Sequence, residues 1–274
     1  MIVARLPSWV APNVITLVGF ACNLMTHLLM IYLYGFSTEG PMDSWFCVFM
    51  AVSYFTYCTL DNCDGKQARR TGNGSPLGML FDHGCDAMTA VLNNIMVQRI
   101  LQMGSGAPAL ICMMVSTIPF YYLILEEFYL GVLMMPMFSG PDDSSLAYYA
   151  LCLYTAWAGS EALWAAEHNF FGFGEMRLSH VFMVVVAFFE IASVLNGVCT
   201  NLWNGRHSEH FQKRFSAASF VFHTSYLFVV CCVWLGYTML PGNGLLAAHP
   251  KLTMLAYGGQ FLQGTLRVLI SGVT

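Results

Sequence analysis

Four aspartates lie close together in a chain that carries little charge. Asp61 and Asp64 are three residues apart, and Asp82 and Asp86 are four residues apart. Residues at these spacings share one face of an α-helix, so the sequence predicts two helix faces with two carboxylates each. Carboxylates beside apolar segments repel one another and are costly to ionise unless a cation compensates them. The spacing therefore predicts a cation site between two helices.

The residue types favour a particular cation and chemistry. Hard oxygen ligands suit Mg²⁺ or Mn²⁺, and the ten cysteines show no zinc spacing. Two such ions would suit phosphoryl transfer. Lys66, Arg69 and Arg70 are then expected to hold phosphate oxygens, although a membrane anchor is an equal alternative for Arg70. His83 is expected to orient a ligand carboxylate or to act on a proton.

The composition decides which elements must position these residues. Of 274 residues, 57% are hydrophobic and 9% are charged, whereas soluble proteins carry about 25% charged residues. This excludes a water-facing surface and predicts a polytopic membrane protein. The net charge of −4 and the lack of a basic stripe argue against nucleic acid as a partner.

Apolar runs of bilayer-crossing length predict eight transmembrane helices in an all-α bundle. These runs cover residues 14–34, 44–60, 77–102, 107–125, 145–164, 178–203, 215–240 and 252–273. The start of the chain lacks the pattern of a cleavable signal peptide, so the first span is expected to direct insertion. No internal repeat divides the chain, which is treated as one domain over residues 1–274.

The basic residues predict that both termini face the cytosol. On that orientation the inner segments hold Arg5, Lys66, Arg69, Arg70, Arg206, Lys213 and Arg214, and the outer loops hold Arg177 and Lys251. The aspartates then lie at the cytosolic boundary.

Turn-forming residues separate several of these runs. They occur at 72–76, 139–143 and 241–244. The sequon at Asn73 falls in the first of these segments and is read as turn chemistry rather than as a glycosylation site.

Written as a pattern, the stretch 61–86 is D-x2-D-G-x2-A-R-x8-G-x3-D-x3-D. It resembles the complete signature of the CDP-alcohol phosphotransferases. The segment PSWVAPNVITLVGF at 7–20, the form FDHGCD at 81–86 and the segment LEEFYLGVLMMPMFSGP at 125–141 resemble the eukaryotic choline and ethanolamine phosphotransferase branch.

The resemblance implies transfer of phosphocholine or phosphoethanolamine from CDP-choline or CDP-ethanolamine to diacylglycerol, with release of CMP. It implies that the four aspartates bind two Mg²⁺, for which Mn²⁺ could substitute. Arg69 would hold the donor phosphates beside Gly65, and Asn13 would contact the nucleotide-bearing substrate. His83 would be the general base for the lipid hydroxyl, a role that Asp86 takes in wider parts of the family.

The resemblance also bears on the head group and on location. Glu126 and Glu127 are expected to pair with the amino alcohol. Nearby aromatic residues would offer a cage for quaternary ammonium or a membrane-interface belt: Tyr121, Tyr122, Phe128 and Tyr129. A homodimer in the endoplasmic reticulum or Golgi, with its active site toward the cytosol, is expected.

Other interpretations stay open. One is a phosphatidyltransferase with an inositol or glycerophosphate acceptor, and another is a catalytically inactive short form, because the chain looks short at both ends beside the family. A divalent-cation transporter would use intramembrane carboxylate and imidazole groups, such as those of His27, Glu190 and His223. Choline and ethanolamine are not distinguished.

Overall fold

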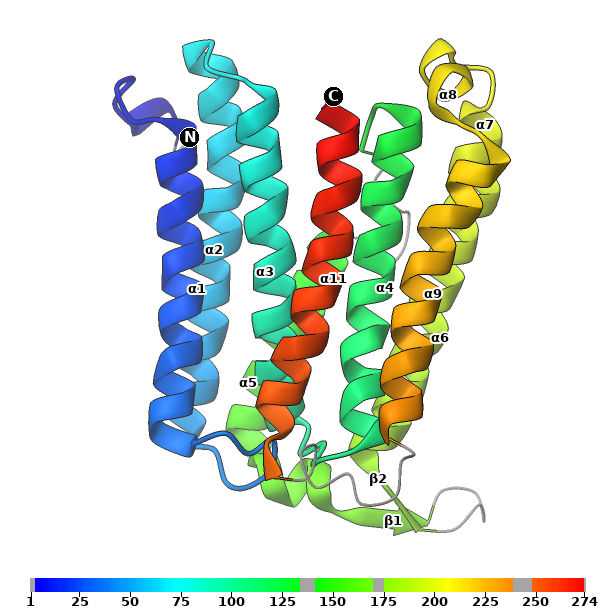
Figure 1. Cartoon of the computed structure of the whole chain (residues 1–274). Coiled ribbons are helices and arrows are strands. Elements are labelled where there is room, and N and C mark those ends of the chain that lie inside the picture. Colours follow the sequence, from blue (N-terminus) through cyan, green and yellow to red (C-terminus); the bar gives the residue numbers. More distant parts are fainter. Residues whose placement is uncertain (1–2, 134–140, 170–174, 239–247, 274) are drawn as a thin grey trace.

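The protein is an all-helical bundle in this computed structural model, which describes residues 3–133, 141–169, 175–238 and 248–273 (Figure 1). Eight helices of at least 18 residues in the described ranges run side by side in alternating directions. They are α1 (Pro12–Tyr34), α2 (Ser44–Thr71), α3 (Pro76–Ile100), α4 (Ala107–Leu130), α5 (Pro141–Ala158), α6 (Leu178–Asn196), α9 (Ala217–Thr238) and α11 (Pro250–Val273). The start of α1, the α2–α3 turn and the end of α11 lie at one end of the bundle (Figure 1).

Short elements cover the two ends of the bundle. The end that carries both termini holds the 3₁₀ turn η1 (Val3–Arg5), α7 (Trp203–Gly205) and α8 (Glu209–Arg214), and the π-helical turn η3 (Gly197–Leu202) leads into α7. The opposite end holds the π-helical turn η2 (Glu161–Ala165) and an antiparallel ribbon of β1 (Glu167–Asn169) and β2 (Glu175–Arg177). Strands of three residues are too short to show an alternating pattern in the sequence, so they were not predicted.

Each predicted apolar run falls on one of the long helices. Among the described residues, four stretches are long and apolar enough to cross a membrane by length and composition: α1, α4, α9 and the continuous stretch Leu178–Gly205. The crossing of all eight helices stays a prediction. The main difference lies in α2, which continues past the end of the predicted apolar run at Leu60 to Thr71. Asp61 and Asp64 are therefore helical residues, as their spacing predicts.

The turn between α2 and α3 brings the two aspartate pairs together. Gly72 ends α2 in the left-handed conformation, with φ of 69°, and its N–H bonds to the carbonyl of Ala68. Ser75 caps α3 by accepting the N–H of Gly78 at 3.0 Å, and Pro76 fills the first helical position. The turn predicted at 72–76 is confirmed. The turn at 241–244 and part of the turn at 139–143 lie outside the described residues.

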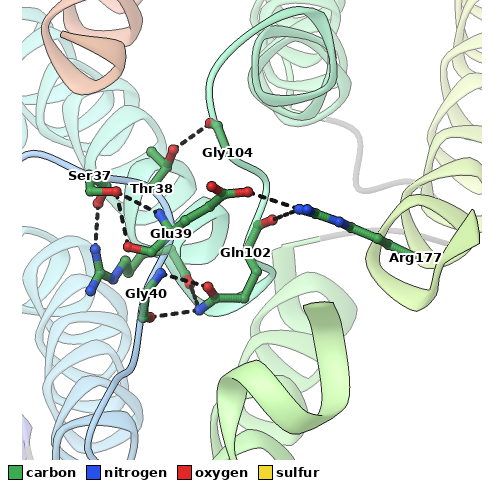
Figure 2. A network of polar contacts seen from close by, with 8 residues as sticks. Ser37, Thr38, Glu39, Gly40, Gln102, Gly104 and Arg177 are labelled. Carbon is green, nitrogen blue, oxygen red and sulfur yellow. Dashed lines mark hydrogen bonds and ion pairs between the residues drawn. The ribbon is translucent and has the colours of Figure 1, made fainter. Parts of the chain in front are cut away.

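A polar network ties the loops at the end opposite the aspartates (Figure 2). Gln102 exchanges two hydrogen bonds with the backbone of Gly40, at 2.7 and 2.9 Å. Arg177 of β2 forms an ion pair with Glu39 at 2.8 Å, and the buried Arg99 donates to carbonyls of the same α1–α2 loop. These bonds connect the α1–α2 loop with the end of α3 and with β2, so they brace the ends of α2 and α3, the helices that carry the aspartates.

Candidate active site

The four aspartates meet between α2 and α3, near the end of the bundle that carries both termini. One carboxylate oxygen from each of Asp61, Asp64 and Asp82 lies within 4.8 Å of the other two. In a second group, one carboxylate oxygen from each of Asp82 and Asp86 and one ring nitrogen of His83 also lie within 4.8 Å of one another. Asp82 belongs to both groups. Two acidic clusters therefore share one carboxylate.

Some carboxylate oxygens of these aspartates have no hydrogen-bond donor near them in the described part of the chain. Within the described residues, Oδ1 of Asp61 and Oδ1 of Asp82 are buried and have no hydrogen-bond partner. Asp64 is only 4% exposed. Buried anions at this density repel one another and lose hydration, which costs free energy unless a cation is shared between them. The first cluster offers only oxygen ligands, so the residues present fit Mg²⁺ or Mn²⁺.

Two hydroxyl groups and a backbone amide orient the aspartate carboxylates. Thr16 of α1 donates to Oδ2 of Asp64, and the N–H of Gly65 donates to Oδ1 of the same side chain. Tyr57 of α2 donates to Oδ1 of Asp86. Such bonds fix which oxygen is left for a ligand. Thr16 and Tyr57 were not predicted from the sequence. One helical turn separates Tyr57 from Asp61, and this spacing could have indicated the shared face.

His83 lies between the second aspartate pair and α4. Its Nε2 is 2.9 Å from Oε2 of Glu127, while its Nδ1 is 3.7 Å from Asp82 Oδ2 and 3.9 Å from Asp86 Oδ2. The Nδ1 atom is buried without a hydrogen-bond partner among the described residues. One ring nitrogen is therefore engaged and the other faces the carboxylates. Glu127 was predicted to pair with the amino alcohol, and its contact with His83 was not predicted.

Three further predicted residues border the clusters. The guanidinium of Arg69 lies over Gly65, where Nη1 is 3.7 Å from the position that a Cβ would occupy. Arg69 is exposed, and within the described part of the chain no hydrogen bond or ion pair engages it. Asn13, at the start of α1, has its Oδ1 3.4 Å from the corresponding Cβ position of Gly78. The glycines therefore leave room where Arg69 and Asn13 approach α2 and α3.

The other two basic residues of α2 point elsewhere. Successive residues of an α-helix are about 100° apart, so Lys66 lies about 160° around the helix from Asp64. Arg70 donates from its two Nη atoms to the backbone carbonyls of Val3 and Leu6. Of the three basic residues, Arg69 lies nearest to an aspartate around the helix, about 80° from Asp61. The anchoring alternative fits Arg70.

The remaining residues predicted to recognise the head group are mostly packed inside the protein. Glu126 is 6% exposed and lies so close to Gly197 of η3 that a Cβ there would overlap its Oε1. The hydroxyl of Tyr121 donates to the carbonyl of His223 at 3.1 Å, and Tyr129 is fully buried. These two rings do not line an open cage. Tyr122 and Phe128 are only half-buried.

Comparison with known proteins identifies the family of this chain. The profile of the family described as CDP-alcohol phosphatidyltransferase matches residues 9–192. Choline/ethanolaminephosphotransferase 2 of Arabidopsis thaliana is 32% identical over 215 residues, which cover 74% of this chain and 54% of that protein. Cholinephosphotransferase 1 of Mus musculus is 41% identical over 129 residues, which cover 47% and 32%.

An uncharacterized CDP-alcohol phosphatidyltransferase class-I family protein 2 of Dictyostelium discoideum is 39% identical over 156 residues, covering 57% of this chain and 37% of that protein. The chain thus spans about a third to a half of the length of these curated relatives.

Proposed function

The chain belongs to the CDP-alcohol phosphatidyltransferase family, and we propose that it transfers phosphocholine or phosphoethanolamine from the CDP-linked amino alcohol to diacylglycerol. The products are CMP and phosphatidylcholine or phosphatidylethanolamine. The observation that carries this proposal is the pair of acidic clusters sharing Asp82, with the free nitrogen of His83 directed toward Asp82 and Asp86. The names of similar proteins favour this branch over those with inositol or glycerophosphate acceptors.

The metal ligands in this proposal are Asp61, Asp64, Asp82 and Asp86, which would hold two Mg²⁺, with Mn²⁺ as a substitute. The unpartnered oxygens of Asp61 and Asp82 support the assignment. When bound, the ions would neutralise charge that develops on the phosphoryl oxygens. Thr16 and Tyr57 keep the carboxylates oriented for binding.

We assign the general base to His83. The short contact between Nε2 and Glu127 fits a tautomer in which Nε2–H donates to the carboxylate, which leaves the lone pair of Nδ1 free. Nδ1 would accept the proton as the O–H bond of diacylglycerol breaks, and the lipid oxygen would form a bond to the phosphorus that carries the amino alcohol. The bond from that phosphorus to CMP then breaks. Glu127 would stabilise the imidazolium. Asp86 is the alternative base, but its Oδ1 already accepts the hydroxyl of Tyr57.

The donor would bind beside the clusters. Arg69 supplies a cation that no neighbour in the described residues engages, and it lies over Gly65, next to Asp64. A guanidinium is suited to hold diphosphate oxygens through paired hydrogen bonds. Asn13 would contact the nucleotide. Glu126 stays a predicted contact of the amino alcohol, although its carboxylate lies against Gly197.

We further propose that all eight long helices cross the membrane of the endoplasmic reticulum or Golgi, with the aspartate end toward the cytosol. The excess of basic residues at that end supports this orientation. A homodimer is part of the same prediction.

The test is a donor comparison in vesicles that contain the purified chain and diacylglycerol. Labelled CDP-choline, CDP-ethanolamine and CDP-diacylglycerol are supplied in parallel, each with Mg²⁺ or with a chelator. CMP release from a CDP-amino alcohol is expected in the presence of Mg²⁺ and not in the presence of the chelator. In a parallel reaction, inositol or glycerophosphate is added as a water-soluble acceptor. CMP release only from CDP-diacylglycerol in that reaction would assign the chain to another branch of the family. No turnover of any donor would favour the inactive short form, and metal uptake without CMP release would favour a transporter.

A further inference from the structure

A cavity of about 640 Å³ lies between α2, α5 and η1, on the face of α2 that points away from the aspartates. The reaction proposed above does not use it. The side chains that matter for its character are Phe55, Asn62 and Lys66 from α2 and Leu146 and Tyr149 from α5. Because Lys66 is about 160° around α2 from Asp64, the cavity and the acidic clusters occupy opposite faces of the same helix.

The wall of this cavity changes character along α2. Lys66 lies near the end of the bundle that holds the aspartates, Asn62 is one turn deeper, and Phe55 is about 16 Å from Lys66 along the helix axis. Phe55 is 61% exposed and Leu146 of the neighbouring helix is 67% exposed, so the deep part presents apolar surface. A cavity that is cationic at the boundary and apolar below it matches an amphiphile lying parallel to the helices.

The positive charge of Lys66 at the boundary favours an anionic head group. Lys66 is the charged residue among those that line the cavity, and no described residue forms an ion pair or hydrogen bond with its ammonium group. Asp143, near the start of α5, is not among the lining residues. A neutral lipid would leave Lys66 without a partner, and a small water-soluble anion would leave the apolar wall uncovered.

The 3₁₀ turn η1 closes one side of this cavity. Val3 belongs to the lining, and its carbonyl accepts a hydrogen bond from Arg70, one helical turn beyond Lys66. Arg70 therefore holds the N-terminal segment in place over the cavity and is not itself available to a ligand.

We propose that this cavity binds an anionic phospholipid, with its phosphate at Lys66 and Asn62 and one acyl chain along Phe55, Leu146 and Tyr149. The site is separate from the site of the transfer reaction. The inference rests on insertion of the chain in a bilayer and does not depend on that reaction.

The experiment uses the full chain in nanodiscs that contain a photoactivatable phosphatidylglycerol, with the reactive group on the acyl chain. Peptide mapping is expected to find the label on the α2 and α5 segments around Phe55, Leu146 and Tyr149. Lys66→Glu is expected to lower this labelling about fivefold or more, whereas Lys66→Arg retains it. Leu146→Trp, which fills the cavity, is expected to lower it as well.

The matched controls are Lys213→Glu and Leu195→Trp. Lys213 is an exposed cation at the same end of the bundle, and Leu195 is an exposed leucine of α6 that does not line the cavity. Neither is expected to change labelling at the cavity, and size-exclusion profiles check that each variant is folded. A phosphatidylcholine probe with the same reactive group is expected to label the cavity less.

Equal labelling of the cavity in all variants would overturn the proposal, as would equal labelling by the anionic and zwitterionic probes. Loss of labelling with unlabelled inorganic phosphate as competitor supports the phosphate contact. Protection by unlabelled diacylglycerol alone would overturn it by identifying a neutral acyl-chain site. Because the readout is labelling, absence of CMP release would contradict the proposed function without affecting this result.

Discussion

Replacing Glu127 with Gln tests whether this carboxylate acts on His83 or on the substrate. The side chains are 12% exposed for His83 and 19% exposed for Glu127, so solvent screens their 2.9 Å contact only partly. A hydrogen bond to a charged partner contributes about 1.5–3 kcal/mol, which corresponds to about 10- to 150-fold in rate. An amide oxygen can still accept the Nε2–H, so the expected fall in kcat is near the lower end, about tenfold to thirtyfold.

The assay is CMP release from vesicles over a range of CDP-choline and CDP-ethanolamine concentrations. Since Glu127 is proposed to act through His83, kcat should fall while KM for the donor changes little. Glu209→Gln is the control, because Glu209 is an exposed carboxylate at the same end of the bundle. A rise in KM for the donor with kcat unchanged would refute the role on His83 and restore the amino-alcohol contact.

Three more variants test the remaining assignments. Asp86→Asn should lower the rate of CMP release by two or more orders of magnitude, because a metal ligand is lost. The control Asp143→Asn changes an exposed residue of α5 and should leave the rate unchanged. Equal rates for the two variants would contradict the assignment of Asp86 as a ligand. Tyr57→Phe removes the hydroxyl that orients Asp86. The variant should need an Mg²⁺ concentration about tenfold higher or more for its half-maximal rate. An unchanged Mg²⁺ titration would contradict the orienting role of Tyr57. Arg69→Ala should raise KM for the CDP donor, because the guanidinium of Arg69 lies over Gly65 beside the clusters. Arg70→Ala should leave this KM unchanged, because the guanidinium of Arg70 donates to backbone carbonyls. The opposite pattern in the same kinetic assay would exchange the roles of the two arginines.

The sequence alone was sufficient for features that depend on periodicity and local chemistry. The i, i+3 spacing of Asp61 and Asp64 and the i, i+4 spacing of Asp82 and Asp86 put each pair on one helix face in any α-helix. Glycine, serine and proline at 72–76 indicated the turn that brings the two faces together, since each residue type has a fixed backbone or capping preference. Long apolar runs indicated the helices and their approximate ends.

Contacts between helices were decided only by the tertiary structure. His83 meets Glu127 from α4, and Thr16 of α1 meets Asp64 from α2. These partners are far apart in the chain, and the axial offset and rotation of packed helices depend on the fit of many side chains at once. The direction of Lys66 followed from periodicity only once α2 was known to continue past Leu60. A pattern within one helix fixes a face, but the residue that this face meets depends on how neighbouring helices pack.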